Sequence, residues 1–384
     1  MSKQQHILFI SHDASLSGAP ILLQNLLLLL QENKAARITV VIRRGGPLAA
    51  QFHDHFPVMV LKPAGYRQGG AFKKLRHIMH NRWQLLRLFM VMPSVDVIFS
   101  NTIINGPLLK TLSLFKKPVV TYVHELENVI RSYPAETAVT LQYSRKLAYP
   151  SLRVKEALAT VCKAPAERLL PLSYYFPVNL AMLADAAARE TFAGAFRQRF
   201  NVTDNDLLVG GMGVACDRKG TDIFVETCGL VARANPRIKF CWIGNFDSTA
   251  TEAALKAQVA ALGIQNQMIF CGPMPHHYYN LAAFDVFFLS SREDPYPLAV
   301  LEAGFMQVPS ICFAGAGGIP EFVEADAGWI VPRLSAESAA QTILTLLPNK
   351  ALLQQKGAAA LQKSLEWHAN GARILQQFQA LIST

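Results

Sequence analysis

The fold of this chain is constrained most strongly by short apolar runs that alternate with segments of helical spacing. This alternation predicts parallel sheets covered by helices on both faces. It occurs twice, with a weaker stretch between about residues 165 and 205. The strands predicted in the first part are Ile7–Ile10, Ile38–Ile42, Val58–Leu61, Val95–Phe99 and Val119–Val123. Those predicted in the second part are Leu207–Gly213, Ile238–Ile243, Met268–Phe270, Val286–Leu289, Ser310–Phe313 and Trp329–Val331.

Two α/β domains are therefore expected. The chain has 384 residues, of which 51% are hydrophobic and 17% charged, enough to bury a core in each domain. We place the domains at residues 1–180 and 205–365 and predict a C-terminal helical segment over residues 366–384. Open α/β sheets bind ligands at the carboxyl ends of their strands, so the loops that follow the strands are expected to carry the chemistry.

Positive charge is concentrated in the first half of a chain whose net charge is +10. Residues 1–180 hold 22 Lys and Arg against 9 Asp and Glu, whereas residues 181–384 hold 15 against 18. This asymmetry indicates a negatively charged partner for the first half. The segment 72–91 is basic and amphipathic and carries Trp83, so it either lies on an anionic membrane surface or packs on its own core. No zinc pattern or nucleic-acid-binding module accompanies these residues, so no nucleic-acid partner is expected.

The apolar runs near the N-terminus predict neither a signal peptide nor a membrane span. Ile7–Ile10 is too short for a signal core, and Ile21–Leu30 is half of the roughly 20 residues that a span requires. We therefore expect a cytoplasmic protein. The six cysteines form no Cys-x-x-Cys pair and are predicted to be buried thiols in a reducing compartment, with neither disulfide nor metal; they are Cys162, Cys216, Cys228, Cys241, Cys271 and Cys312.

The most informative segment is Asp294-Pro-Tyr-Pro-Leu-Ala-Val-Leu-Glu302, which follows a predicted strand. Pro297 is placed to open a helix, so Asp294 lies in the loop and Glu302 about a turn and a half inside the helix. The first carboxylate could meet sugar hydroxyls and the second a ribose diol. The helix start between them offers amides and partial positive charge to a diphosphate. The alternative is that Asp294 only caps the helix.

Two further loops have matching chemistry. Glycine-rich Ala314-Gly-Ala-Gly-Gly-Ile-Pro-Glu321 follows the strand 310–313, and its glycines permit close backbone approach. Gly213-Val-Ala-Cys-Asp-Arg-Lys-Gly220 follows the strand 207–213, and its adjacent cations Arg218 and Lys219 could neutralise a leaving diphosphate. A solvated basic turn is the alternative for this second loop.

Three strand ends in the first domain complete the candidate residues. The first loop, Ser11–Pro20, contains Gly18, whose backbone could approach a ligand or form a plain strand–helix turn. His124 follows the strand 119–123, where it either takes part in the functional site or has only a structural role. Ser100-Asn-Thr102 ends another strand and is expected to line the same region.

These motifs together resemble the family-4 glycosyltransferases, which belong to glycosyl transferases group 1. The segment 294–302 is similar to the family's Glu-x7-Glu signature, residues 317–321 to its Gly-Gly-x-Pro-Glu, and Arg218-Lys219-Gly220 to its Arg-Lys-Gly variant. The resemblance implies a GT-B fold, with two Rossmann-like domains whose parallel sheets face a cleft. The N-terminal domain would bind the acceptor, the C-terminal domain would bind the nucleotide sugar, and the last helix would pack back on the first domain.

The resemblance also implies roles for named residues. The residues implied to be catalytic are Lys219, Arg218, His124 and Asp294. Those implied to bind the donor are Gly18, Gly213, Tyr296, Pro297, Leu298, Glu302, Gly317 and Gly318. The implied reaction moves a sugar from a nucleoside diphosphate sugar to an acceptor hydroxyl with retention of anomeric configuration. It uses neither a metal nor a cofactor, and the acceptor is a carbohydrate or a lipid-linked sugar of bacterial polysaccharide, lipopolysaccharide or glycolipid assembly.

Three positions depart from the family pattern. Asp294 replaces the usual Glu, Pro297 replaces a Gly and so removes an amide, and Val214 stands where an Arg is usual. These departures keep a non-catalytic nucleotide-sugar-binding protein open as an alternative, beside a sugar-nucleotide epimerase of the same fold. The sequence does not identify the base, the sugar, the acceptor, the linkage or the oligomeric state.

Overall fold

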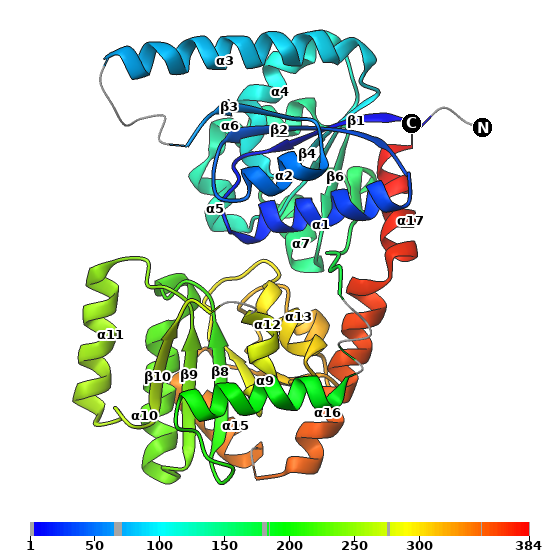
Figure 1. The fold of residues 1–384 in the computed structure, drawn as a ribbon. Helices are drawn as coiled ribbons and strands as arrows, with labels where there is room; N and C mark the ends of the chain where they lie inside the picture. The colour runs from blue at the N-terminus through cyan, green and yellow to red at the C-terminus, as the bar shows by residue number, and fades with distance from the viewer. Residues whose placement is uncertain are drawn as a thin grey trace. The chain divides into compact units, whose positions relative to one another are not determined.

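The chain folds into two compact α/β units. The computed structural model describes residues 4–64, 71–178, 183, 185–274, 277–346 and 348–383. Unit 1 comprises Met1–Pro177 and Asn370–Thr384, and unit 2 comprises Val178–Ala369 (Figure 1). The C-terminal residues therefore belong to unit 1, and residues 178–204, which precede the predicted start of the second domain, belong to unit 2.

Unit 1 is built on a parallel sheet whose described strands have the order β3-β2-β1-β4-β5-β6-β7. The first strand, His6–Ser11, is buried at every position, as expected for a strand covered on both faces. The strands are β1 (His6–Ser11), β2 (Arg37–Arg44), β3 (Val58–Lys62), β4 (Val97–Ser100), β5 (Val119–Tyr122), β6 (Lys146–Tyr149) and β7 (Leu169–Pro171). The sequence pattern does not predict β6 and β7, because their apolar runs are only two or three residues long.

The helices of unit 1 connect these strands. They are α1 (Gly18–Glu32), α2 (Ala49–His55), α3 (Ala71–Val91), α4 (Gly106–Leu112), α5 (Glu127–Ser132), α6 (Pro134–Tyr143), α7 (Leu152–Thr160) and α17 (Gly371–Ile382), with single turns η1 (Met92–Ser94), η2 (Ile103–Asn105), η3 (Ser113–Phe115) and η4 (Ala166–Arg168). The C-terminal helix α17 places Phe378 against Phe9 and Phe99, with ring centroids 6.2 and 5.6 Å away. Lys146 Nζ donates to the carbonyls of Ala380 and Ser383, both at 2.8 Å.

Unit 2 repeats the design with strand order β10-β9-β8-β11-β12-β13, all pairs parallel. Counted along this unit, the order is 3-2-1-4-5-6, the arrangement of a Rossmann-like sheet. Its described strands are β8 (Leu207–Met212), β9 (Ile238–Ile243), β10 (Met268–Gly272), β11 (Val286–Leu289), β12 (Ser310–Phe313) and β13 (Gly328–Val331). The predicted fold class, α/β with two Rossmann-like units on parallel sheets, is confirmed.

Apolar helix faces complete the core of unit 2. Helices α10, α11 and α15 contribute Phe224, Val259 and Ile343 to one cluster with strand residues such as Phe240 and Phe288. The helices of this unit are α9 (Ala186–Arg199), α10 (Thr221–Ala234), α11 (Thr249–Leu262), α12 (His277–Asn280), α13 (Leu298–Phe305), α14 (Pro320–Val323), α15 (Ala336–Leu346) and α16 (Lys350–Ser364), with single turns η5 (Asp217–Lys219), η6 (Leu281–Ala283) and η7 (Leu365–Ala369). Among the described residues, no helix is both long enough and apolar enough to cross a bilayer.

Candidate functional site

The sheet order of unit 2 brings the predicted loops together. The strand order of the sheet reverses between β8 and β11, and ligands of such sheets bind at the carboxyl ends of the strands near that point. The loops after β8, β11 and β12 are residues 213–220, 290–297 and 314–319. They contain most of the predicted unit 2 site residues, and the others, Leu298 and Glu302, lie in α13.

An ion pair between Lys219 and Asp294 lies at the centre of this region. Lys219 Nζ and Asp294 Oδ2 are 2.5 Å apart, and the two side chains are only 14% and 8% exposed. Arg218 NH1 lies 3.5 Å from the same carboxylate oxygen and donates to the carbonyl of Glu293 at 2.9 Å. The Lys219 ammonium is therefore no solvated surface charge, whereas Arg218 is half exposed. The alternative that Asp294 merely caps the helix is wrong, since Pro297 is the N-cap residue of α13 and the Asp294 carboxylate accepts from Lys219.

Glycines set the position of Lys219. Gly213 has φ +140°, and a Cβ built on it would lie 3.2 Å from Lys219 Cε, so the lysine side chain runs directly over this glycine. Gly220 has φ +62°, and its Cβ would lie 2.0 Å from the carbonyl oxygen of Ser290. Ser290 Oγ in turn donates to the carbonyl of Lys219 at 3.0 Å. The loops after β8 and β11 are thus packed backbone to backbone, which fixes where the ammonium can lie.

Gly317 joins the third loop to Asp294. The Asp294 amide donates to the Ala316 carbonyl at 2.7 Å, and the Gly318 amide donates to the Pro295 carbonyl at 3.1 Å. Gly317 has φ +139°, and a Cβ there would lie 1.7 Å from the Asp294 carbonyl oxygen. Gly317 therefore allows the loop after β12 to pack directly on the loop after β11. This packing holds the backbone of Asp294 in place.

Arg292 is a further residue of this region that the sequence does not single out. Its guanidinium binds both carboxylate oxygens of Asp222 at 2.7 and 2.6 Å and donates to the Asp217 carbonyl at 2.7 Å. The Arg292 hydrogen bond lowers the pKa of the Asp222 carboxyl. Arg292 also donates its amide to the Arg218 carbonyl at 2.9 Å, so it ties the Arg218–Lys219 turn to the first turn of α10. The sequence signal is weak: an arginine in an acidic loop, 70 residues from its partner.

The helix after the Asp294 loop begins as the proline pattern predicts. Pro297 is the N-cap residue at φ −68°, and Leu298 is the first residue of α13. Tyr296 is buried, and its hydroxyl lies 3.3 Å from Nε2 of His368. Glu302 is half-buried in the second turn. The helix start therefore presents main-chain amides beside the Lys219–Asp294 pair, the arrangement that suits an anionic group.

The predicted residues of unit 1 also come together. Asn101, in the loop after β4, donates its amide Nδ2 to the Ala19 carbonyl at 2.8 Å, and its Oδ1 lies 2.8 Å from His124 Nε2. The other ring nitrogen of His124 lies 3.2 Å from the hydroxyl of Tyr174. Burial lowers the pKa of His124 to about 3, so the ring is neutral at neutral pH. Gly18 begins α1 beside Ala19. His124 is therefore suited to act as a neutral hydrogen-bonding group and not as an imidazolium.

A buried carboxyl group adjoins His124. Glu125 accepts hydrogen bonds from the Thr102 hydroxyl and the His124 amide, and burial raises its pKa. Thus Gly18 and His124 are brought near each other within unit 1, and the other predicted site residues are brought together within unit 2. Over the described ranges, no three His, Cys, Asp or Glu side chains gather in a geometry that could hold a metal ion.

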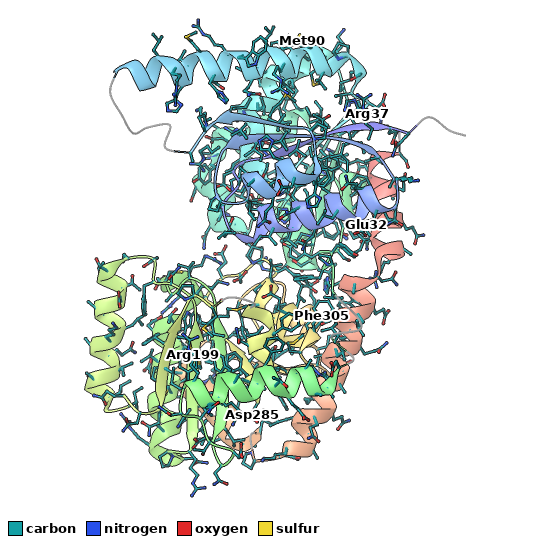
Figure 2. All side chains as sticks on the ribbon, viewed as in Figure 1. Glu32, Arg37, Met90, Arg199, Asp285 and Phe305 are labelled. Atoms are coloured by element: carbon teal, nitrogen blue, oxygen red, sulfur yellow. The ribbon has the colours of Figure 1, made fainter. Side chains whose placement is uncertain are left out.

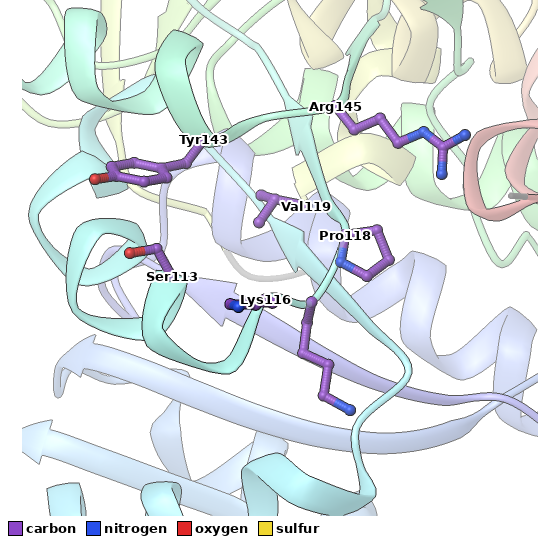
Figure 3. A pocket seen from close by; sticks show the side chains of 7 residues that line it. Ser113, Lys116, Pro118, Val119, Tyr143 and Arg145 are labelled. Atoms are coloured by element: carbon purple, nitrogen blue, oxygen red, sulfur yellow. The ribbon is translucent and has the colours of Figure 1, made fainter.

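A surface cavity of about 580 Å³ lies elsewhere on unit 1 (Figure 3). It is lined by Ser113, Lys116, Lys117, Pro118, Val119, Tyr143 and Arg145. Because Val119 is the first residue of β5, this cavity lies at the amino end of the strand, opposite the end that carries His124. The cavity is basic, and it is not part of the predicted site.

Comparison with known proteins finds a family match within unit 2. Residues 194–363 match the family described as glycosyl transferases group 1. The match includes all the predicted site residues of unit 2.

Individual relatives fit the same class. The chain is 35% identical over 65 residues to the processive diacylglycerol alpha-glucosyltransferase of Acholeplasma laidlawii. The aligned segment covers 17% of this chain and 18% of that protein. It is 25% identical over 204 residues to the amylovoran biosynthesis glycosyltransferase AmsK of Erwinia amylovora, 49% of each chain. The chain therefore spans less than half the length of these curated relatives.

Among solved structures, HepE of Anabaena in complex with UDP and glucose covers 99% of this chain and 100% of its own, with a TM-score of 0.80 and 18% identity. At this identity the similarity shows the fold.

Proposed function

We propose that this protein is a retaining glycosyltransferase that moves a sugar from a nucleoside diphosphate sugar to an acceptor hydroxyl. The observation that carries the proposal is the Lys219–Asp294 ion pair, 2.5 Å long and largely buried beside the start of α13. It lies at the switch point of a Rossmann-like sheet, within the segment that matches the glycosyl transferases group 1 family.

In the proposed reaction, the departing diphosphate develops negative charge that must be stabilised. Lys219, Arg218 and the amides at the start of α13 supply this stabilisation, and the contribution of Lys219 is strengthened by its burial. When the diphosphate takes over the contact with Lys219, the Asp294 carboxylate becomes available to a hydroxyl of the donor sugar. The ion pair therefore keeps both groups in position and compensated before the donor binds.

The nucleoside is proposed to bind beside this pair. Glu302 would accept hydrogen bonds from the ribose diol, and Tyr296, Pro297, Leu298 and the glycine loop at Gly317 and Gly318 would line the donor site. Support comes from the Anabaena HepE structures in complex with UDP and with UDP-glucose, whose fold this chain shares. A uridine nucleotide is accordingly the first candidate donor.

We propose further that neither a metal ion nor a separate cofactor takes part, and that the neutral His124 of unit 1 hydrogen-bonds the reacting sugar. The acceptor would be a carbohydrate or lipid-linked sugar of polysaccharide, lipopolysaccharide or glycolipid assembly, a proposal supported by the functions of the two curated relatives named above. The protein would work in the cytoplasm, peripherally at the inner face of a membrane.

The test is the substitution Lys219→Ala. Transfer from the preferred nucleotide sugar should fall at least about 100-fold, the usual cost of one transition-state donor. Lys239→Ala is the matched control, because Lys239 pairs with Asp206 at 3.1 Å with similar exposure, 17% and 11%, in the same unit. Lys239 precedes the middle of β9, away from the strand carboxyl ends, so its loss should leave kcat unchanged.

Donors are found by thermal shift with UDP-, GDP-, ADP- and dTDP-sugars, since a ligand that binds the folded state raises Tm. Product analysis by NMR then distinguishes transfer from epimerisation. Near-normal transfer by the Lys219 variant would refute the proposed site. Binding of a nucleotide sugar without hydrolysis, transfer or epimerisation would instead favour a binding protein.

A further inference from the structure

The basic helix α3 has an inward face that accounts for its place in unit 1. Leu88 is fully buried, and Leu85, Phe89 and Val91 pack on the same cluster, which includes β3 residues Met59 and Leu61. His80 Nε2 lies 2.9 Å from the Val60 carbonyl on β3. The residues of this face have the spacing of a helix packed on a core. They account for only part of the apolar side chains of α3. The side chains of Phe72, Lys73 and Lys74 lie outside the described residues.

The outward face of α3 is also apolar. Leu75, Met79, Trp83, Leu86 and Met90 are 55%, 64%, 57%, 50% and 61% exposed. Successive members are four, four, three and four residues apart, so they form one stripe about 80° wide, roughly 22 Å long. Six of the thirteen large exposed hydrophobic side chains among the described residues belong to this helix, when Ile78 is included. Figure 2 shows Met90 directed away from the sheet of unit 1.

Arginines border the stripe. Arg82 lies on one side of it and Arg76 and Arg87 on the other, and all three are exposed. The sequence contains no Asp or Glu between Asp54 and Asp96, but seven Lys and Arg. An apolar stripe edged by arginines, without acidic residues, matches the chemistry of an anionic lipid surface.

The basic cavity lies next to the C-terminal end of α3. Phe89 of α3 contacts Phe115 with ring centroids 5.5 Å apart, and Lys117 Nζ donates to the Pro93 carbonyl at 3.4 Å. Lys116, Lys117 and Arg145 line this cavity, and the neighbouring Leu114 is 77% exposed. Positive charge and exposed apolar side chains therefore continue beyond the helix.

Other occupants fit this surface less well. A nucleic acid would be bound by the arginines but would leave five aliphatic and aromatic side chains in water. A second copy of unit 1 would bring the three arginines of each copy close together, since a two-fold contact pairs like surfaces. A bilayer compensates both features, because tryptophan and leucine enter the headgroup boundary while arginine binds lipid phosphate.

We infer that the outward face of α3 binds anionic membranes peripherally, with Trp83 and the other stripe residues at the acyl boundary and the three arginines among the headgroups. The membrane association proposed above is thereby assigned to a defined surface of the protein. Membrane binding does not depend on sugar transfer, so either proposal can fail while the other stands.

The experiment is sedimentation with vesicles of phosphatidylcholine, with and without 30% phosphatidylglycerol. The whole chain should bind the anionic vesicles and bind the neutral ones far less. Trp83→Ser with Leu86→Ser should weaken partitioning about 100-fold or more, since two large apolar side chains leave the acyl boundary. Arg76→Gln, Arg82→Gln and Arg87→Gln together should weaken it roughly 100-fold, since each cation near an anionic surface contributes about fivefold.

Matched controls come from exposed residues of the same unit. Leu16→Ser with Leu152→Ser removes side chains that are 68% and 55% exposed, and Lys34→Gln, Lys110→Gln and Lys163→Gln together remove three exposed charges. Neither control should change partitioning by more than about twofold. Trp83 is the one tryptophan of unit 1, so quenching by brominated lipid should be lost in Trp83→Phe. Unchanged melting curves establish that each variant is folded.

Four results would overturn the inference. The α3 variants would sediment with anionic vesicles as the unchanged protein does, or the control variants would lose binding equally. Brominated lipid would fail to quench Trp83. Light scattering would show a dimer that Trp83→Ser converts to a monomer, which would assign the face to a second copy of this chain.

Discussion

Gly317→Ala is the substitution whose effect can be worked out most fully from the structure. The new Cβ would lie 1.7 Å from the Asp294 carbonyl oxygen and 2.7 Å from its carbon, at φ +139°. Ordinary contact needs more than 3 Å, so the loops after β11 and β12 must part by more than 1 Å. That separation breaks the hydrogen bonds from Asp294 to Ala316 and from Gly318 to Pro295, now 2.7 and 3.1 Å long.

The cost follows from these contacts. A side chain at such a backbone conformation costs about 1–3 kcal/mol. Each of the two lost backbone hydrogen bonds costs about 1 kcal/mol. The free energy of unfolding of unit 2 should therefore fall by about 4 kcal/mol, and its Tm by roughly 8–16 °C for a unit of this size. Asp294 would move relative to Lys219, and a displacement of about 1 Å in a site lowers turnover roughly 100-fold.

Tryptophan fluorescence during heating or urea unfolding reports mainly on unit 2, because Trp242, Trp329 and Trp367 lie there. Gly315→Ala is the matched control in the same loop: its Cβ would have no atom within 4 Å, and its φ is not positive. That variant should be unchanged or stabilised by up to about 1 kcal/mol. Equal unfolding midpoints for the two variants would refute the reasoning.

Three further outcomes are expected. Arg292→Gln should lower kcat/KM about tenfold by releasing the Arg218–Lys219 turn from Asp222, whereas Arg333→Gln, at an exposed position, should change neither kcat nor KM. The neutral His124 stabilises unit 1 at pH values above about 6.5, which is the pKa of histidine in the unfolded chain. This contribution to stability is lost as the pH falls from 6.5 toward the folded-state pKa of about 3. Between pH 7 and 5 the unchanged protein should thus lose about 2 kcal/mol more unfolding free energy than His124→Asn, by urea titration. Cys312, whose pKa burial raises to about 12, should react with a thiol reagent at pH 8 only after unfolding.

The sequence predicts the strands with long apolar runs well. β1, β2 and β8–β13 appear close to the predicted positions, because strands buried on both faces need continuous apolar residues. β6 and β7 are not predicted, since Lys146–Tyr149 and Leu169–Pro171 carry too few apolar residues for a periodic signal. Pairing of β6 with β5 and of β7 with β6 stabilises these short strands, and a local pattern does not contain such contacts.

For the site too, the sequence determined some features and the tertiary structure others. The sequence by itself determined which residues could carry the chemistry, since Lys219, Asp294, Glu302 and Gly317 stand out by charge, spacing and backbone freedom within short segments. Only the tertiary structure decided their partners. Lys219 and Asp294 are 75 residues apart in the chain, and the parallel strands β8 and β11 bring them within 2.5 Å.

Long-range pairing also explains the residues that sequence reasoning missed or left open. Arg292 is informative only once Asp222 is placed opposite it, and His124 only once Asn101 and Tyr174 are placed at its two ring nitrogens. Likewise the sequence predicted a basic amphipathic helix near residues 72–91, but packing decided which apolar side chains face the core and which stay in solvent. Spacing along a chain indicates the longer helices and strands, whereas the contacts between them depend on sheet order, which no local segment encodes.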